Sequence, residues 1–241
     1  MTDVFIVSAV RAPTGKFLGA LKGFQATELG ALVVKEAVRR AGVKAAAVDE
    51  VILGNVVSAG LGQNPARQAA LGSGLPPSVG ALTINKVCGS GLKAVMLARQ
   101  GILAKDASLV VAGGMESMSN GPYLIPRLRE GLRLGNGELI DAVVHDGLWD
   151  VYNDFHMGIT GEKVAEKYAV SRREMDAYAA ESHRRAAEAT EAGKFRREIL
   201  PIEIPQKKGA PLVIDRDEPI RPDTTAEALA KLKPVFKDDG T

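Results

Sequence analysis

The stretch LTINKVCGSGLKA, residues 82–94, places a lone cysteine between an apolar run and a glycine-rich segment. Residues 82–87 have the length and apolar character of a strand. Residues 89–103 begin with glycines and continue with small and apolar side chains, which is typical of a helix that packs on a sheet. We therefore predict a strand that runs directly into a helix, with Cys88 at the start of that helix.

The same alternation of elements extends on both sides of this stretch. Strand-length apolar runs and helix patterns follow one another, beginning with a strand, at residues 4–10, 27–40, 51–57, 63–75, 82–87, 89–103 and 109–112. This order predicts an α/β layer built from right-handed crossovers. We expect a mixed sheet with helices on both faces.

Charged residues are unevenly distributed along the 241 residues. Residues 1–118 contain only 12 of the 31 Lys and Arg residues and 7 of the 29 Asp and Glu residues. A low charge density suits strands covered by helices, whereas a polar segment suits a surface position. We therefore predict an α/β domain over residues 1–118 and a polar loop domain over residues 119–241.

The predicted loop domain has weaker patterning. Gly, Pro and Asn punctuate residues 119–161, which predicts an extended loop with little regular structure. Ser171 and Glu174 match a capping box that opens a helix to about Ala192. The remaining elements are a short strand pair and a short helix, predicted at residues 199–204, 212–215 and 227–232.

The composition narrows the classes of function. A hydrophobic fraction of 46% with a net charge of +2 suits a soluble folded protein and argues against a sequence-independent nucleic-acid binder. No apolar run has the length of a membrane span, and the first ten residues resemble neither a signal nor a transit peptide. We expect a cytoplasmic protein with neither nucleic acid nor a membrane as partner.

Cys88 is the residue with the clearest chemical potential. At a helix start, exposed backbone N–H groups and the helix dipole favour the thiolate, which is the nucleophilic form of cysteine. The same N–H groups can stabilise the oxyanion of an acyl group. A free cysteine is otherwise commonly a small buried hydrophobic residue. The residues alone therefore leave a nucleophilic and a packing role open.

A second interpretation comes from residues 89–94, GSGLKA, which fit the dinucleotide-binding pattern G-x-G-x-x-A. That pattern expects an acidic residue at the end of the next strand, where it holds a ribose. Residues 109–112 run instead into two glycines, and Glu116 is displaced. A nicotinamide- or flavin-dependent oxidoreductase is therefore the weaker alternative.

Several segments in the same order resemble the thiolase family. They are VSAVRAPTG at residues 7–15, NKVCGSGLKA at 85–94, GGMESMS at 113–119, DFHMG at 154–158 and the run over residues 221–240. Together they span essentially the whole chain, and the biosynthetic, acetoacetyl-CoA type of thiolase is the most similar. The resemblance implies a thiolase-like fold.

The resemblance also implies an acyl-CoA acyltransferase of fatty acid metabolism. Cys88 would accept an acetyl group from acetyl-CoA, and the acyl-enzyme would serve to form acetoacetyl-CoA or to cleave a 3-oxoacyl-CoA and release a CoA ester. The residues implied to contact CoA or the acyl group are Leu148, His156, Met157, Arg221 and Phe236. No metal and no cofactor besides the CoA thioester substrates is implied. At Ala228 the family commonly has a serine that bonds CoA, and thiolases associate as homodimers or homotetramers.

In thiolases the activating histidine, a second catalytic cysteine and an oxyanion-hole asparagine come from a second, similar half, which these residues do not contain. We therefore expect the amino-terminal part of a thiolase, inactive without the carboxyl-terminal half. A non-catalytic CoA-binding module is a further alternative. His145, His156 and His183 are not assigned as the base for Cys88, and His183 is expected on an exposed helix face.

Overall fold

The computed structural model describes residues 3–241, whose contacts divide the chain into two units. Unit 1 contains residues 3–147 and the later segment Glu198–Asp215. Unit 2 contains Leu148–Arg197 and Arg216–Thr241. The shift in charge near residue 118 does not coincide with a boundary between these units, because residues 119–147 make their contacts within unit 1.

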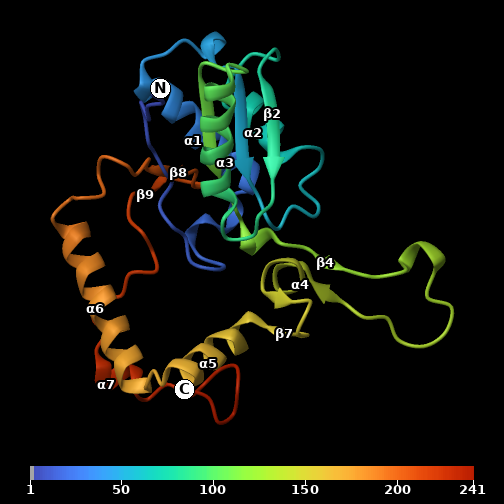
Figure 1. Ribbon diagram of the computed structural model, residues 1–241, viewed down its shortest axis with the longest axis vertical. Coiled ribbons are helices and arrows are strands. Elements are labelled where there is room, and N and C mark those ends of the chain that lie inside the picture. Colours follow the sequence, from blue (N-terminus) through green and yellow to red (C-terminus); the bar gives the residue numbers. More distant parts are fainter. Residues whose placement is uncertain (1–2) are drawn as a thin grey trace. The chain divides into compact units, whose positions relative to one another are not determined.

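Unit 1 is built on a three-stranded sheet with the order β2-β1-β3 (Figure 1). The strands are β1 (Glu50–Gly54), β2 (Gly80–Ile84) and β3 (Val110–Gly114), and both pairings are parallel. Helical crossovers join them, so each strand returns to the same edge and lies parallel to its neighbour. The α/β class is confirmed, but the described sheet is parallel and not mixed.

The predicted first strand, residues 4–10, is wrong. These residues belong to no strand, and Phe5 and Ile6 are 77% and 80% exposed. The first strand-like pairing comes at Arg11, which forms a parallel bridge with Ile199. An apolar run predicts a strand only where the chain also supplies partners on its sides, and residues 4–10 find none among the described residues.

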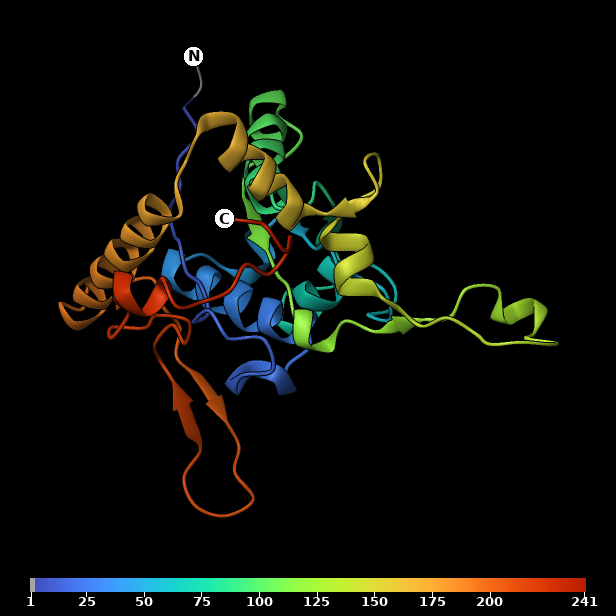
Figure 2. The same cartoon turned by 90° about the horizontal axis from the view of Figure 1, so that it is seen from below.

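Helices cover both faces of the sheet, as expected. α1 (Ala26–Ala41) and α2 (Pro65–Gly72) pack together on one face, and α3 (Ser90–Ala104) packs on the other (Figures 1 and 2). α1 is capped at its start by Gln25, whose amide donates a hydrogen bond to the Glu28 carboxylate, and at its end by Gly42, whose φ is 68°.

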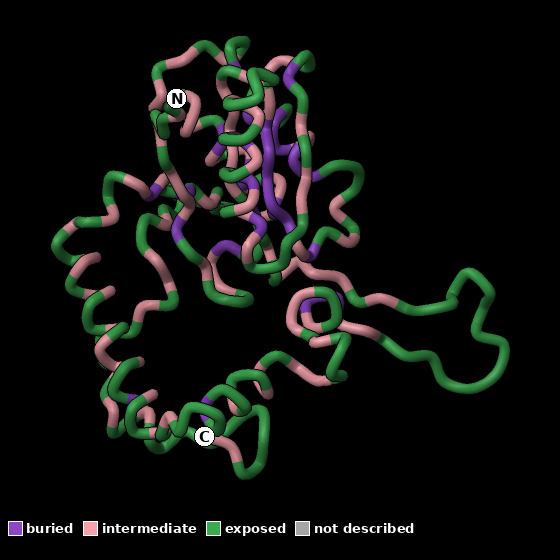
Figure 3. Tube along the Cα trace, viewed as in Figure 1, coloured by how far each residue is buried: buried purple, intermediate pink, exposed green. Residues whose placement is uncertain are grey.

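The core of unit 1 lies around β1 (Figure 3). Val51 is completely buried, and the β1 side chains meet small residues of α2 such as Ala66 and Ala69, which are also inaccessible to solvent. Small side chains let α1 and α2 approach each other closely, since a Cβ on Gly30 would lie 3.2 Å from Ala69 Cβ. This packing fixes the sheet and therefore the ends of its strands.

The rest of unit 1 consists of short elements. They are the 3-10 helices η1 (Ala20–Gly23), η2 (Ala45–Ala47), η3 (Met118–Asn120) and η4 (Leu128–Glu130), the strands β4 (Tyr123–Leu124), β5 (Ile140–Asp141), β8 (Ile202–Ile204) and β9 (Leu212–Ile214), and helix α4 (Ala142–Gly147). β8 and β9 form the predicted strand pair, and the pair is antiparallel. The expectation of little regular structure over residues 119–161 overlooked α4 and the start of the next helix.

Unit 2 contains the strand pair β6 (Trp149–Asp150) and β7 (Phe155–His156), with helices α5 (Met157–Tyr168), α6 (Arg172–Glu191) and α7 (Ala226–Leu229). The predicted capping box of α6 is confirmed, because Glu174 accepts a bond from the Ser171 amide and donates its own amide to Ser171 Oγ. In residues 3–241, no helix is both long and apolar enough to cross a membrane.

Candidate active site

Cys88 lies at the junction between β2 and α3, as predicted. β2 ends at Ile84 and α3 begins at Ser90, so the cysteine belongs to the turn that leaves the carboxyl end of the sheet. The carboxyl ends of parallel strands are the edge where α/β proteins bind ligands. The residue is exposed, which argues against the packing role that the sequence left open.

The turn before Cys88 has an unusual backbone. Val87 has φ 48°, in the left-handed region that β-branched residues rarely adopt, at a cost of roughly 1–3 kcal/mol. The Asn85 side chain supports this conformation, because its Oδ1 accepts a hydrogen bond of 2.9 Å from the Val87 amide. The chain can therefore turn sharply from β2 into α3.

The amide of Cys88 is the exception among the backbone donors of this turn. The Gly89 amide donates to Lys86 O and the Ser90 amide to Val87 O, each at 3.1 Å. No bond of comparable geometry joins the Cys88 amide to another residue within the described part of the chain. An N–H group beside an exposed thiol can donate to the oxyanion of a thioester that the thiol attacks.

Glycines around this turn serve the packing of α3 on the sheet. A Cβ on Gly54 of β1 would lie 2.5 Å from Ser90 Cβ and 2.8 Å from its carbonyl carbon. A Cβ on Gly91 would lie 3.8 Å from the Gly113 backbone of β3. Gly54 thus permits the first turn of α3 to lie directly on the sheet. This contact sets the position of Cys88, which precedes that turn, relative to the ends of the strands.

Glu116, the displaced acid of the dinucleotide pattern, is occupied by the end of β1. Its carboxylate accepts hydrogen bonds from Asn55 Nδ2 at 2.8 Å and from the Val56 and Val57 amides at 2.9 and 3.1 Å. The residue keeps an exposed surface, but its carboxylate faces these donors. Partial burial raises the pKa of Glu116, against the hydrogen bonds from the two amides, which lower it. A carboxylate used in this way holds the loop after β1, not a ribose.

Unit 2 brings together four of the five residues implied to contact CoA or the acyl group. The Met157 amide donates to Leu148 O at 2.8 Å, and the His156 ring stacks on Phe236 with a centroid distance of 4.9 Å and an interplanar angle of 17°. His156 also caps α5, since its Nδ1 accepts a bond of 3.0 Å from the Gly158 amide. Met157 and Phe236 are 45% and 47% exposed, so an apolar surface is open to a ligand.

Gly158 makes this stack possible. A Cβ at this position would lie 2.3 Å from the Phe236 ring. The ring therefore lies over the first turn of α5, in the space that any other residue would fill. Gly158 was predicted only as part of a family segment, and its contact with a residue 78 positions away has no signal in the sequence.

Arg221, the fifth implied CoA residue, is exposed, and its backbone is tied to α6. The His183 Nδ1 accepts a hydrogen bond of 3.1 Å from the Arg221 amide. His183 is half-buried, so the expectation of an exposed position was wrong. The role of His183 as an acceptor for the Arg221 amide could not be predicted from the charged sequence of α6, because the contact depends on where the fold places Arg221. His145 lies exposed in α4.

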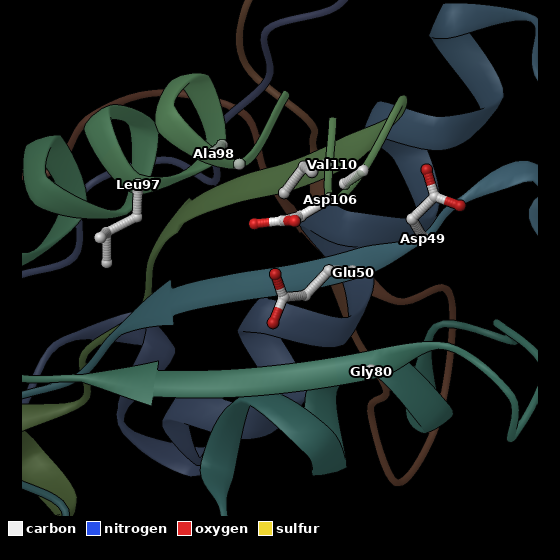
Figure 4. Close-up of a pocket in the computed structure, with 9 residues that line it drawn as sticks. Asp49, Glu50, Gly80, Leu97, Ala98, Asp106 and Val110 are labelled. Atoms are coloured by element: carbon white, nitrogen blue, oxygen red, sulfur yellow. The ribbon is translucent and has the colours of Figure 1, made fainter. Parts of the chain in front are cut away.

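The opposite edge of the sheet carries an acidic hollow of about 330 Å³, lined by residues that include Asp49, Glu50 and Asp106 (Figure 4). Asp49 accepts hydrogen bonds from the Ser108 and Leu109 amides at 2.7 and 3.0 Å, which lower the pKa of its carboxyl group. This carboxylate ties the start of β1 to the start of β3. Over residues 3–241, no three His, Cys, Asp or Glu side chains gather as a metal site would require.

An exposed thiol at the carboxyl edge of a parallel α/β layer, beside an unbonded amide, defines a protein with a candidate cysteine nucleophile. The sequence matches the thiolase amino-terminal domain family over residues 4–241. The chain belongs to the thiolase family.

Named relatives agree with this assignment. The chain is 56% identical to an acetyl-CoA acetyltransferase of Pseudomonas aeruginosa and 54% identical to one of Cupriavidus necator. It is also 54% identical to a probable acetyl-CoA acetyltransferase of Escherichia coli. Each match covers the whole chain but 61% of the relative, so the chain spans less than two thirds of the curated relatives it matches.

Proposed function

We propose that Cys88 is the nucleophile of a thiolase that transfers acetyl groups between CoA thioesters. The thiolate attacks the carbonyl carbon of acetyl-CoA, the carbon–sulfur bond to CoA breaks, and CoA leaves as a thiolate that takes up a proton. The acetyl group stays on Cys88 as a thioester. A base removes a proton from the α carbon of a second acetyl-CoA, and this carbon attacks the acetyl carbonyl group. The bond to Cys88 breaks, the thiolate is regenerated and acetoacetyl-CoA is released, and the reverse sequence cleaves a 3-oxoacyl-CoA.

The observation that carries this proposal is the exposed Cys88 at the start of α3 with an unbonded amide beside it. One short segment thereby offers both a nucleophile and a donor for the developing oxyanion. The role of Glu116 at the end of β1 disfavours the oxidoreductase alternative. Membership in the thiolase family favours acyl transfer independently of the geometry.

For the CoA side of the reaction, we assign Leu148, His156, Met157 and Phe236 to pantetheine and acyl contacts and Arg221 to the nucleotide. The exposed apolar surface of Phe236 suits the pantetheine chain, and that of Met157 suits the small acyl group. An exposed guanidinium suits stacking and charge on an adenine nucleotide. At Ala228 this chain lacks the serine expected from the family, so one polar contact to CoA is absent at that position.

The test is to trap the acyl-enzyme. The intact protein is mixed with isotopically labelled acetyl-CoA, quenched in acid and digested. The mass of the peptide that contains Cys88 is then measured by mass spectrometry. We expect one labelled acetyl group on that peptide and none in Cys88→Ala, which should retain the fold because the thiol is exposed. Labelling that persists in Cys88→Ala, or no labelling of the wild type, would remove the proposed nucleophile.

A further inference from the structure

The Ser90 side chain closes the turn that carries Cys88. Its hydroxyl accepts a hydrogen bond of 2.8 Å from the Lys86 amide and donates one of 2.6 Å to Val87 O. The donor and one acceptor position of the hydroxyl are thus both used within the turn. Ser90 is 4% exposed, so water does not compete for these partners.

The sheet limits where this hydroxyl can lie. Ser90 Cβ packs against Gly54 of β1 so closely that a Cβ on Gly54 would lie 2.5 Å from it. Ser90 therefore cannot move toward the sheet. The side chain links a rigid strand end to the backbone on both sides of Val87.

Val87 is the residue that most needs such support. Its left-handed conformation, with φ 48°, is unfavourable for a β-branched side chain and persists only where the surroundings impose it. Two side chains support it here: Asn85 accepts from the Val87 amide, and the Ser90 hydroxyl donates to the Val87 carbonyl beside the longer bond from the Ser90 amide. Without the second contact the turn can relax toward an ordinary backbone.

We propose that Ser90 is a positioning residue for the Cys88 nucleophile: its hydroxyl holds Val87 in the left-handed conformation and thereby fixes the direction of the thiol and the Cys88 amide. The proposal rests on the proposed acyl transfer and adds to it a group that never touches the substrate. Because the thiol and the amide must meet the same carbonyl group, a turn that relaxes should slow acylation while the binding of CoA at a distance continues.

The experiment compares Ser90→Ala with Ser73→Ala in the intact protein. Ser73 is a matched control, because it is 8% exposed and its hydroxyl donates to Ala70 O at 2.6 Å in α2, away from the turn. Rapid-quench measurements with acetyl-CoA give the acylation rate and the half-saturating concentration. We expect Ser90→Ala to slow acylation about ten- to hundredfold with little change in half-saturation, and Ser73→Ala to change neither.

A rescue variant separates positioning from general stability. Asparagine tolerates the left-handed conformation better than valine, and Val87 is 49% exposed, so Val87→Asn can be accommodated. In the Ser90→Ala background, Val87→Asn should restore much of the acylation rate. Equal rates for Ser90→Ala and Ser73→Ala, or a loss that Val87→Asn does not recover, would overturn the proposal.

Alkylation of Cys88 by iodoacetamide tests the same geometry without a substrate. If the wild type forms no acetyl-enzyme, the proposed function fails, but the alkylation rates of the variants can still be compared. We expect a different alkylation rate in Ser90→Ala, the wild-type rate in Ser73→Ala, and a return toward wild type in the rescue variant. An unchanged rate in Ser90→Ala would contradict the positioning role itself.

Discussion

Two junctions between a strand and a helix carry candidate functional residues, one junction in each unit, and they are built in opposite ways. Between β2 and α3, a turn with a left-handed Val87 holds an exposed thiol. Between β7 and α5 there is no turn, since His156 ends the strand and caps the helix with its own ring. The first junction contains a strained backbone conformation, and the second is held by stacked side chains.

The difference teaches what each junction suits. A reacting atom must be placed to within a fraction of an ångström, which strained and hydrogen-bonded backbone achieves. A surface that binds a long flexible ligand needs area and adaptable contacts, which the stacked rings of His156 and Phe236 offer. Changes at the first junction should therefore affect the rate of chemistry, and changes at the second should affect binding.

The largest expected effect is that of Gly54→Ala at the first junction. The added methyl would overlap Ser90 Cβ and the backbone of α3, so α3 must shift, at a cost of about 1–3 kcal/mol in the free energy of unfolding. The free energy of unfolding, measured by denaturant titration, and the acylation rate should both fall. Gly101→Ala is the control, because that Cβ would meet open space and alanine should stabilise α3 by up to about 1 kcal/mol. If Gly54→Ala changed neither the free energy of unfolding nor the acylation rate, the proposed rigidity of the first junction would be wrong.

Arg221→Ala should mainly weaken binding. We expect the Michaelis constant for acetyl-CoA to rise about tenfold, with a much smaller change in kcat, because the guanidinium is assigned to the nucleotide and not to the carbonyl group. Steady-state kinetics of the intact protein measure this. His183→Ala, which removes the acceptor of the Arg221 amide, should reproduce part of the effect. An unaltered Michaelis constant in Arg221→Ala places this residue outside the site.

Gly158→Ala sharpens the comparison at the second junction. Its methyl would displace the Phe236 ring, which is 47% exposed and can swing outward, so the stack with His156 should be lost while the fold survives. We expect a several-fold rise in the Michaelis constant for acetyl-CoA and an unchanged rate of Cys88 alkylation. Gly161→Ala, where a Cβ meets nothing within 4 Å on the same helix, should leave both values as they are.

The smallest effect concerns Glu116. Its pKa is raised in the folded protein above the usual 4.5, so the stability it contributes is present below that value and is lost as pH rises through the raised pKa. Relative to Glu116→Gln, the wild type should therefore lose stability as pH rises above the usual carboxyl pKa and through the raised pKa of Glu116. Glu174 has a lowered pKa, because Ser171 donates to it, and the wild type should gain stability over Glu174→Gln as pH rises from strongly acidic values. Parallel trends in the two pairs of unfolding curves would contradict this assignment.

The sequence predicted the first junction well and the second poorly. An apolar run, a cysteine and closely spaced glycines are local signals, so the order of β2, Cys88 and α3 followed from them. The capping box at Ser171 is equally local, and it located α6. Helix α5 was overlooked because its cap is a histidine and it contains Gly158 and Gly161. None of these residues marks a helix start in the usual way.

Contacts across long sequence separations were beyond the sequence. The pairing of His156 with Phe236 and of His183 with Arg221 depends on where unit 2 folds back on itself. Residues 4–10 show the reverse error, since a strand-like composition was not matched by a partner. The family resemblance supplied the identity of the candidate CoA residues, but not the contacts that hold them.

The bridge between Arg11 and Ile199 sets an order of events during synthesis. The Arg11 amide donates to Glu198 O and its side chain to the Glu198 carboxylate, across 187 positions of sequence. At translation rates of about 5–20 residues per second, the amino-terminal segment waits roughly 10–40 s for this partner to be made. During that interval Phe5 and Ile6, already exposed in the finished fold, are available to chaperones. The discontinuity of unit 1 thus makes its completion a late event in the life of the nascent chain.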